Sequence, residues 1–163
     1  MAYGSVDELN SFIGLSRSYI DKKKLHNIDS ILAKIQNDLF DLGADLCVPD
    51  KDKNDNSLRI NENYVKHLEK NIDLLNQELN PLRSFILPGG TKTSSYLHVA
   101  RTIARRSERE MIELNQLDNE QIGSSAIKYI NRLSDFLFVA ARYVNLRLNK
   151  EDILWIPGDN LNK

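Results

Sequence analysis

The chain has 163 residues, enough for one domain whose apolar core needs neither disulfides nor a structural metal. Its 22 Lys and Arg residues nearly balance 23 Asp and Glu residues, so we expect neither nucleic acid nor an anionic membrane surface as the main partner. No apolar run approaches the roughly 18 residues that a membrane-spanning helix needs. The single cysteine, Cys47, cannot form an internal disulfide. Together these features predict a cytoplasmic protein with no membrane partner.

Apolar residues recur at three- and four-residue intervals through most of the chain, which is the spacing of amphipathic helices. The pattern predicts helices at about residues 5–20, 27–46, 61–80, 91–116 and 121–148. Ser5 followed by Glu8 has the form of a capping box, and Asn61 is the expected cap of the third helix. No stretch alternates like a strand, so we predict one all-α domain over residues 1–163, a five-helix bundle.

Three acids follow one side of the second predicted helix: Asp38, Asp41 and Asp45. Metal ligation is conceivable at this spacing, but acids on an amphipathic helix are more often solvated, and we expect a solvated face. His98 has no Cys or second His at metal-binding spacing, so we expect a hydrogen-bonded structural residue. We therefore predict no protein-only metal site.

The stretch from Phe85 to Glu110 joins an aromatic residue, a Pro-Gly-Gly break and a predicted helix. This helix carries Arg101, Arg105 and Glu108 in one lengthwise stripe beside its apolar line. A guanidinium is costly to bury unless it is paired. We expect the arginines to meet carboxylates, phosphates or a subunit boundary, or else to extend to solvent and pair with Glu108 or Asp135.

Gly89-Gly90-Thr91 opens the same predicted helix but lacks the spacing of a nucleotide-binding phosphate loop. Free N–H groups at a helix N-terminus can hold an anion, whereas a plain turn with an N-cap needs no ligand. The local pattern leaves both interpretations open.

Three blocks of the sequence together resemble the PduO-type ATP:cob(I)alamin adenosyltransferases. They are YGSVDELNS at residues 3–11, FILPGG followed by H-x-A-R-x-x-x-R-R-x-E at residues 85–108, and YINRLSD at residues 129–135. The resemblance implies a five-helix bundle that assembles as a homotrimer with active sites between subunits. It also implies transfer of the 5′-deoxyadenosyl group of ATP to the cobalt of cob(I)alamin, assisted by Mg²⁺, with release of triphosphate. ATP and cobalamin are then the substrates, and a cobalamin reductase or an adenosylcobalamin-dependent enzyme is a further partner.

The resemblance also implies roles for individual residues. Arg101 pairs across the subunit interface with Asp7, which by local pattern alone is a first-turn acid favoured by the helix dipole. Arg105 stabilises charge on the triphosphate, and Glu108 orders this network or the metal-bound phosphate. Asn131 contacts the nucleotide.

Phe85 matches the aromatic residue that the family presses beneath the corrin ring, which excludes the lower axial base and leaves four-coordinate Co(II). Family members also carry a T-x-x-G-D-x-G-x-T segment that wraps the ATP phosphates, whereas here only Met1 and Ala2 precede Tyr3. Because the other matching residues are retained, we expect a sequence that is truncated relative to the natural protein. The alternative is a corrinoid-binding or cofactor-delivery protein that lacks catalysis because the nucleotide loop is missing.

Overall fold

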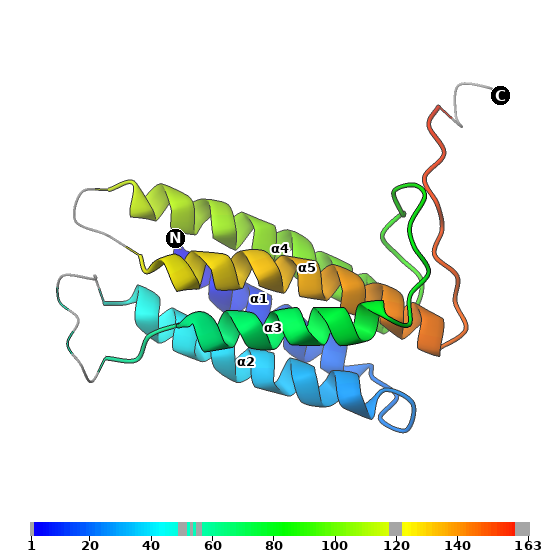
Figure 1. Ribbon diagram of the computed structural model, residues 1–163, viewed down its shortest axis with the longest axis horizontal. Coiled ribbons are helices and arrows are strands. Elements are labelled where there is room, and N and C mark those ends of the chain that lie inside the picture. Colours follow the sequence, from blue (N-terminus) through cyan, green and yellow to red (C-terminus); the bar gives the residue numbers. More distant parts are fainter. Residues whose placement is uncertain (1, 49–51, 53, 55–56, 118–121, 159–163) are drawn as a thin grey trace.

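The structure is a computed structural model that describes residues 2–48, 52, 54, 57–117 and 122–158. These residues form five α-helices and no β-strand: α1 (Ala2–Ser18), α2 (His26–Leu46), α3 (Glu62–Asn76), α4 (Lys92–Asn115) and α5 (Ser124–Arg147). Successive helices run in opposite directions along one long axis (Figure 1). The predicted all-α, five-helix architecture is confirmed. Within the described ranges, no helix combines the length and the apolar character needed to cross a bilayer.

Capping residues decide where two of the helices begin. Asn61 and Thr91 are N-caps whose side chains accept hydrogen bonds from backbone N–H groups in the first turn of α3 and α4. Ser5 is not the predicted N-cap, because α1 already begins at Ala2 and the Ser5 hydroxyl donates to the Ala2 carbonyl oxygen at 2.9 Å. The capping-box prediction is therefore wrong, and Ser5 is an interior residue that bonds back to the preceding turn.

Two predicted helix boundaries also shift. α3 ends at Asn76, because its C-terminal turn tightens into shorter-range hydrogen bonds before the Asn80–Pro81 step. The predicted start of the fifth helix, Gln121, lies outside the described residues, and α5 begins at Ser124. The predicted polar loop at residues 48–60 also lies partly outside them.

The core lies where the apolar stripes of the helices meet. α4 packs against both α1 and α5, α3 packs against α5, and α2 packs against α1. Fully buried side chains from these helices include Leu9, Ile13, Leu32, Leu97, Leu133 and Phe136. This arrangement places the charged stripe of α4 at the edge of its contact with α5.

Two acids that we expected on a solvated face lie in the core. Asp38 is 5% exposed and accepts a hydrogen bond from the Tyr129 hydroxyl at 3.1 Å. Asp45 is 2% exposed and accepts from the backbone N–H of Ile60 at 2.9 Å. Burial raises the pKa of Asp38, although the hydrogen bond from Tyr129 opposes this shift. The solvated prediction is wrong for both acids, because their partners come from segments distant in sequence.

At one end of the bundle, the segment between α3 and α4 lies beside the chain that follows α5 (Figure 1). An isolated antiparallel bridge joins Ile86 to Leu154, and the Trp155 N–H donates to the Phe85 carbonyl oxygen at 2.8 Å. We call residues 84–88 and 153–155 the end wall. This wall bounds the cleft described next.

Candidate functional site

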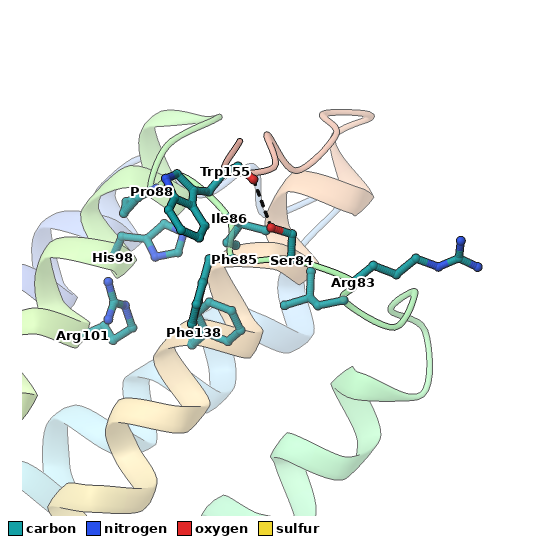
Figure 2. A pocket seen from close by; sticks show the side chains of 10 residues that line it. Arg83, Ser84, Phe85, Ile86, Pro88, His98, Arg101, Phe138 and Trp155 are labelled. Atoms are coloured by element: carbon teal, nitrogen blue, oxygen red, sulfur yellow. Dashed lines mark hydrogen bonds between the residues drawn. The ribbon is translucent and has the colours of Figure 1, made fainter. Parts of the chain in front are cut away.

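An apolar cleft of about 700 Å³ lies between the end wall, α4 and α5. Figure 2 shows three aromatic side chains around it: Phe85 and Trp155 from the end wall and Phe138 from α5. Phe85 is 77% exposed, and its ring meets the Trp155 ring edge-on with 5.9 Å between centroids. An exposed aromatic ring that lines an apolar cleft favours a large, flat and largely apolar ligand.

His98 lies on the α4 side of this cleft (Figure 2). The residue is 3% exposed, and its Nδ1 atom has no hydrogen-bond partner among the described residues. Burial and the nearby charge of Arg101 lower the pKa of His98 from 6.5 to about 4, so the imidazole is neutral at pH 7. The predicted hydrogen-bonded role is therefore not borne out at Nδ1.

Arg101 lies between the apolar cleft and a second, smaller pocket of about 290 Å³, and it lines both. Its Nε atom is buried without a hydrogen-bond partner, and it forms no ion pair within the described part of the chain. Burial and the charge of Arg105 lower the pKa of Arg101. Asp7 is exposed on α1 and likewise has no ion-pair partner among the described residues. The prediction that it is a first-turn acid is wrong, because α1 already begins at Ala2. Within one chain these two predicted partners are not joined.

Three other predicted site residues are brought together. The Glu108 carboxylate lies 2.6 Å from Arg105 Nη1 and accepts a hydrogen bond from Asn131 Nδ2 at 2.8 Å. Glu108 is 9% exposed, whereas the Arg105 side chain is half exposed. One buried carboxylate thus holds both side chains. Glu108 and Asn131 also line a polar groove of about 520 Å³ that extends toward α3.

The same residues bear on metal binding. Within the described ranges, no group of three or more His, Cys, Asp or Glu side chains could hold a metal ion. Mg²⁺, however, is commonly bound by one or two carboxylates together with substrate phosphates. Glu108 supplies such a carboxylate beside Arg105, so the residues present are compatible with a phosphate-bound Mg²⁺.

The Gly89-Gly90-Thr91 segment forms a closed turn against α5. Asn145 Oδ1 accepts from the Thr91 N–H at 3.0 Å, and Asn145 Nδ2 donates to the Gly89 carbonyl oxygen at 3.1 Å. Gly90 has φ +100°, and a Cβ atom there would lie 2.4 Å from Asn145 side-chain atoms. Only glycine is accommodated at this position. Of the two open interpretations, the structure supports the plain turn with an N-cap, because the Thr91 N–H already has a partner.

The sequence patterns did not identify Phe138, Trp155 and Asn145 as parts of this region. Asn145 carried a signal, since a polar residue between Val144 and Leu146 interrupts an apolar stretch of helix. Phe138 carried no such signal, because an aromatic residue on the apolar face of an amphipathic helix usually packs in the core.

The chain is similar to known proteins over most of its length. Residues 1–144 match the model of the family described as cobalamin adenosyltransferase. The chain is 42% identical over 153 residues to the corrinoid adenosyltransferase of Bacillus subtilis, which covers 93% of this chain and 77% of that protein. The Mycobacterium leprae corrinoid adenosyltransferase is 41% identical over 162 residues, covering 97% of this chain and 82% of that protein.

Solved structures are also similar to this chain, over nearly its whole length. A variant of the PduO-type ATP:corrinoid adenosyltransferase from Lactobacillus reuteri, complexed with cobalamin and ATP, matches with a TM-score of 0.88 and 42% identity. The match covers 96% of this chain and 82% of that chain. A second variant from the same organism, complexed with ATP, has a TM-score of 0.86 at 42% identity and covers 95% of this chain and 85% of that one.

Proposed function

The chain belongs to the cobalamin adenosyltransferase family, and from this premise we propose that it transfers the 5′-deoxyadenosyl group of ATP to the cobalt of cob(I)alamin. Co(I) is the nucleophile, and its electron pair forms the bond to C5′ of the nucleoside. The C5′–O bond breaks, and triphosphate leaves with that electron pair. The products are adenosylcobalamin and triphosphate. A variant of the related Lactobacillus reuteri enzyme is complexed with cobalamin and ATP.

One observation carries the proposal most directly. The apolar cleft and the smaller arginine pocket share Arg101 and Phe138 as lining residues. A flat corrin in the cleft and an anionic nucleotide beside Arg105 would therefore meet at Arg101. Because the metal supplies the nucleophile, the protein has to position the two reactants and stabilise the leaving charge.

On the corrin side, Phe85 is the proposed contact with the ring. Its exposed aromatic face has no atom that can coordinate cobalt, so a corrin pressed against it has neither water nor a lower axial base on that side. Cobalt is then four-coordinate in the Co(II) state, which is easier to reduce. His98 adds an uncharged imidazole to the apolar cleft, since its low pKa keeps it neutral.

On the nucleotide side, Arg105 is the proposed contact with the leaving triphosphate. Its half-exposed guanidinium is held at Glu108, which also orients the amide of Asn131 toward the nucleotide. Mg²⁺ would be held by triphosphate oxygens near the Glu108 carboxylate and would neutralise part of the leaving charge.

We further propose that the protein is a homotrimer with its sites between subunits. Arg101 and Asp7 both lack an ion-pair partner within the described residues of one chain. A pair between Arg101 of one subunit and Asp7 of the next would satisfy both, because a partly buried guanidinium needs an anion.

The function is tested by mixing the protein with ATP, Mg²⁺ and chemically reduced cobalamin while following the corrinoid absorption spectrum. We expect adenosylcobalamin to form, and we expect Arg105→Ala to lower kcat/KM for ATP by about tenfold or more through loss of a charge-assisted contact. Arg109→Ala is the matched control, since Arg109 is exposed one turn further along α4. Absence of product from a protein that carries the family's N-terminal phosphate-binding segment refutes the enzyme, and corrinoid binding without product favours a delivery protein.

A further inference from the structure

The last turns of α5 hold both segments of the end wall. Arg142 is 7% exposed, and its Nε atom lies 2.7 Å from Asp152 Oδ2 on the chain that follows α5. Its Nη2 atom donates to the Asn80 carbonyl oxygen at 2.8 Å, on the segment that follows α3. One buried guanidinium is thus bonded to both segments shortly before each reaches the end wall.

Asn145, one turn later on α5, bonds to the first segment just after the end wall and to the second segment before it. Its side chain is bonded to Gly89 and Thr91, and its carbonyl oxygen accepts from the Lys150 N–H at 2.8 Å. Arg142 and Asn145 together therefore attach each segment to the rigid end of α5.

The end wall has few attachments of its own. Its two segments are joined by two backbone hydrogen bonds, from Trp155 to Phe85 as described above and from the Leu87 N–H to the Ile153 carbonyl oxygen at 2.8 Å. Ser84 Oγ also donates to the Trp155 carbonyl oxygen at 3.0 Å (Figure 2). A single two-stranded pairing is only marginally stable in water. The positions of Phe85 and Trp155 must therefore depend on what anchors the two segments.

We propose that Arg142 is a positioning residue for the corrinoid side of the reaction. It acts through Asp152 and Asn80, and it keeps Phe85 and Trp155 at a fixed depth in the cleft. This inference rests on the proposed function for its effect on corrinoid, but the anchoring itself can be measured without any substrate. A planar guanidinium suits this role because it donates in two directions from one fixed plane, which a lysine ammonium does not.

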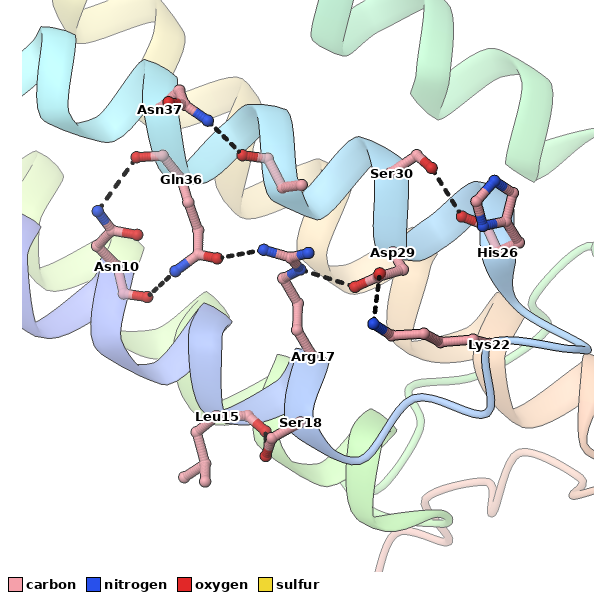
Figure 3. A network of polar contacts seen from close by, with 11 residues as sticks. Asn10, Leu15, Arg17, Ser18, Lys22, His26, Asp29, Ser30, Gln36 and Asn37 are labelled. Carbon is pink, nitrogen blue, oxygen red and sulfur yellow. Dashed lines mark hydrogen bonds and ion pairs between the residues drawn. The ribbon is translucent and has the colours of Figure 1, made fainter.

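The chain offers a closely matched control pair, Arg17 and Asp29, which joins α1 to α2 (Figure 3). Arg17 Nε lies 2.7 Å from Asp29 Oδ1, the same atom types and distance as in the Arg142–Asp152 pair. Arg17 Nη1 also donates to Gln36 Oε1 at 2.8 Å. This pair contacts neither the end wall nor the apolar cleft.

The first test uses Trp155, the only tryptophan of the chain, as a fluorescent reporter without substrates. Asp152→Asn removes the charge without changing the shape, and we expect its Trp155 emission to shift to longer wavelength with about twofold stronger quenching by acrylamide. Asp29→Asn and the charge-retaining Asp152→Glu should both stay close to the unsubstituted protein. Unchanged Trp155 fluorescence in Asp152→Asn, with its helical circular dichroism intact, overturns the anchoring.

The second test follows the corrinoid. With ATP bound, Asp152→Asn should form less four-coordinate cob(II)alamin and should raise the KM for cobalamin about tenfold, while the KM for ATP changes less than about twofold. Asp29→Asn should change neither constant, and Asp152→Glu should recover much of the four-coordinate signal. Equal increases in both KM values, or equal effects of Asp152→Asn and Asp29→Asn, show a general loss of stability and overturn the positioning role. A lack of turnover in an unsubstituted protein that carries the family's N-terminal phosphate-binding segment refutes the function and leaves the fluorescence result standing.

Discussion

Replacement of Phe85 by alanine should separate corrinoid chemistry from stability. Phe85 is 77% exposed, so less than a quarter of its surface is buried. Full burial of a phenylalanine is worth about 1.5–3 kcal/mol, and an edge-on aromatic pair adds about 0.5–1.5 kcal/mol. The free energy of unfolding should therefore fall by only about 1–2 kcal/mol. The matched control is Phe136→Ala, which removes a fully buried ring and should cost about 3–5 kcal/mol.

The exposed part of Phe85 is the part proposed to contact the corrin. If three-quarters of the ring is buried by bound cobalamin, its loss removes about 1–2 kcal/mol, equivalent to roughly five- to thirtyfold in the KM for cobalamin. A lower axial ligand can then reach the cobalt, which makes Co(II) harder to reduce. When the reaction starts from cob(II)alamin and the reductant is limiting, kcat should therefore also fall. The assay is adenosylcobalamin formation at varied cobalamin, with denaturant unfolding in parallel.

Two results would refute this reasoning. The first is a large loss of stability in Phe85→Ala, comparable to that in Phe136→Ala, which would make Phe85 a packing residue. The second is an unchanged KM for cobalamin together with an unchanged four-coordinate Co(II) spectrum, which would remove Phe85 from the corrin site.

Three further predictions concern α1 and α4. Glu108→Gln keeps the shape but removes the charge that holds Arg105, so kcat/KM for ATP should fall about tenfold or more with little change in the KM for cobalamin. Asp7→Asn should lower activity, and exchange of the charges in Asp7→Arg with Arg101→Asp should recover part of it. His98 has a folded-state pKa of about 4 against 6.5 unfolded, so unfolding takes up a proton between these values. As the pH falls from 6.5 to about 4, stability should decrease by about 3 kcal/mol, and His98→Gln should remove this dependence.

A control variant or an additivity test distinguishes each of these effects from a general loss of activity or stability. Glu113→Gln, exposed on α4, should leave ATP kinetics unchanged; an equal effect of Glu108→Gln and Glu113→Gln would contradict the proposed network. Strictly additive losses in the charge exchange would argue against the intersubunit pair. His26 is exposed, so His26→Gln should leave the pH dependence of unfolding in place, and the same slope in His98→Gln would mean that His98 is not the group responsible.

The fold could be predicted because its determinants are local and periodic. Apolar side chains recur every three or four residues along each helix, so the sequence itself shows which face is buried. N-caps such as Asn61 and Thr91 accept hydrogen bonds from the first turn of their own helix. The Ser5 prediction was wrong because a serine hydroxyl can make two kinds of local hydrogen bond. It can accept from a following backbone N–H, as an N-cap does, or donate to a preceding carbonyl oxygen, and Ser5 donates to that of Ala2.

The site was predictable only in part, because its remaining determinants lie far apart in sequence. The stripe of Arg101, Arg105 and Glu108 could be placed on one helix edge, and the ion pair between Arg105 and Glu108 spans one turn. Asp38, by contrast, is buried because Tyr129 on another helix satisfies it. Nor could any local pattern indicate that Trp155 lies against Phe85, since that contact depends on how the chain returns after α5.

The end wall is joined by main-chain atoms, with the Leu87 N–H donating to the Ile153 carbonyl oxygen at 2.8 Å and the Trp155 N–H to that of Phe85. Such bonds do not depend on which side chains the residues carry. With its two segments anchored by Arg142 and Asn145, the wall can therefore keep its register while single side chains on its inner surface change. A library of substitutions at residues 84–88 and 153–155 is accordingly the natural place to select variants that accept corrinoids with different lower ligands, while the bundle itself is left untouched.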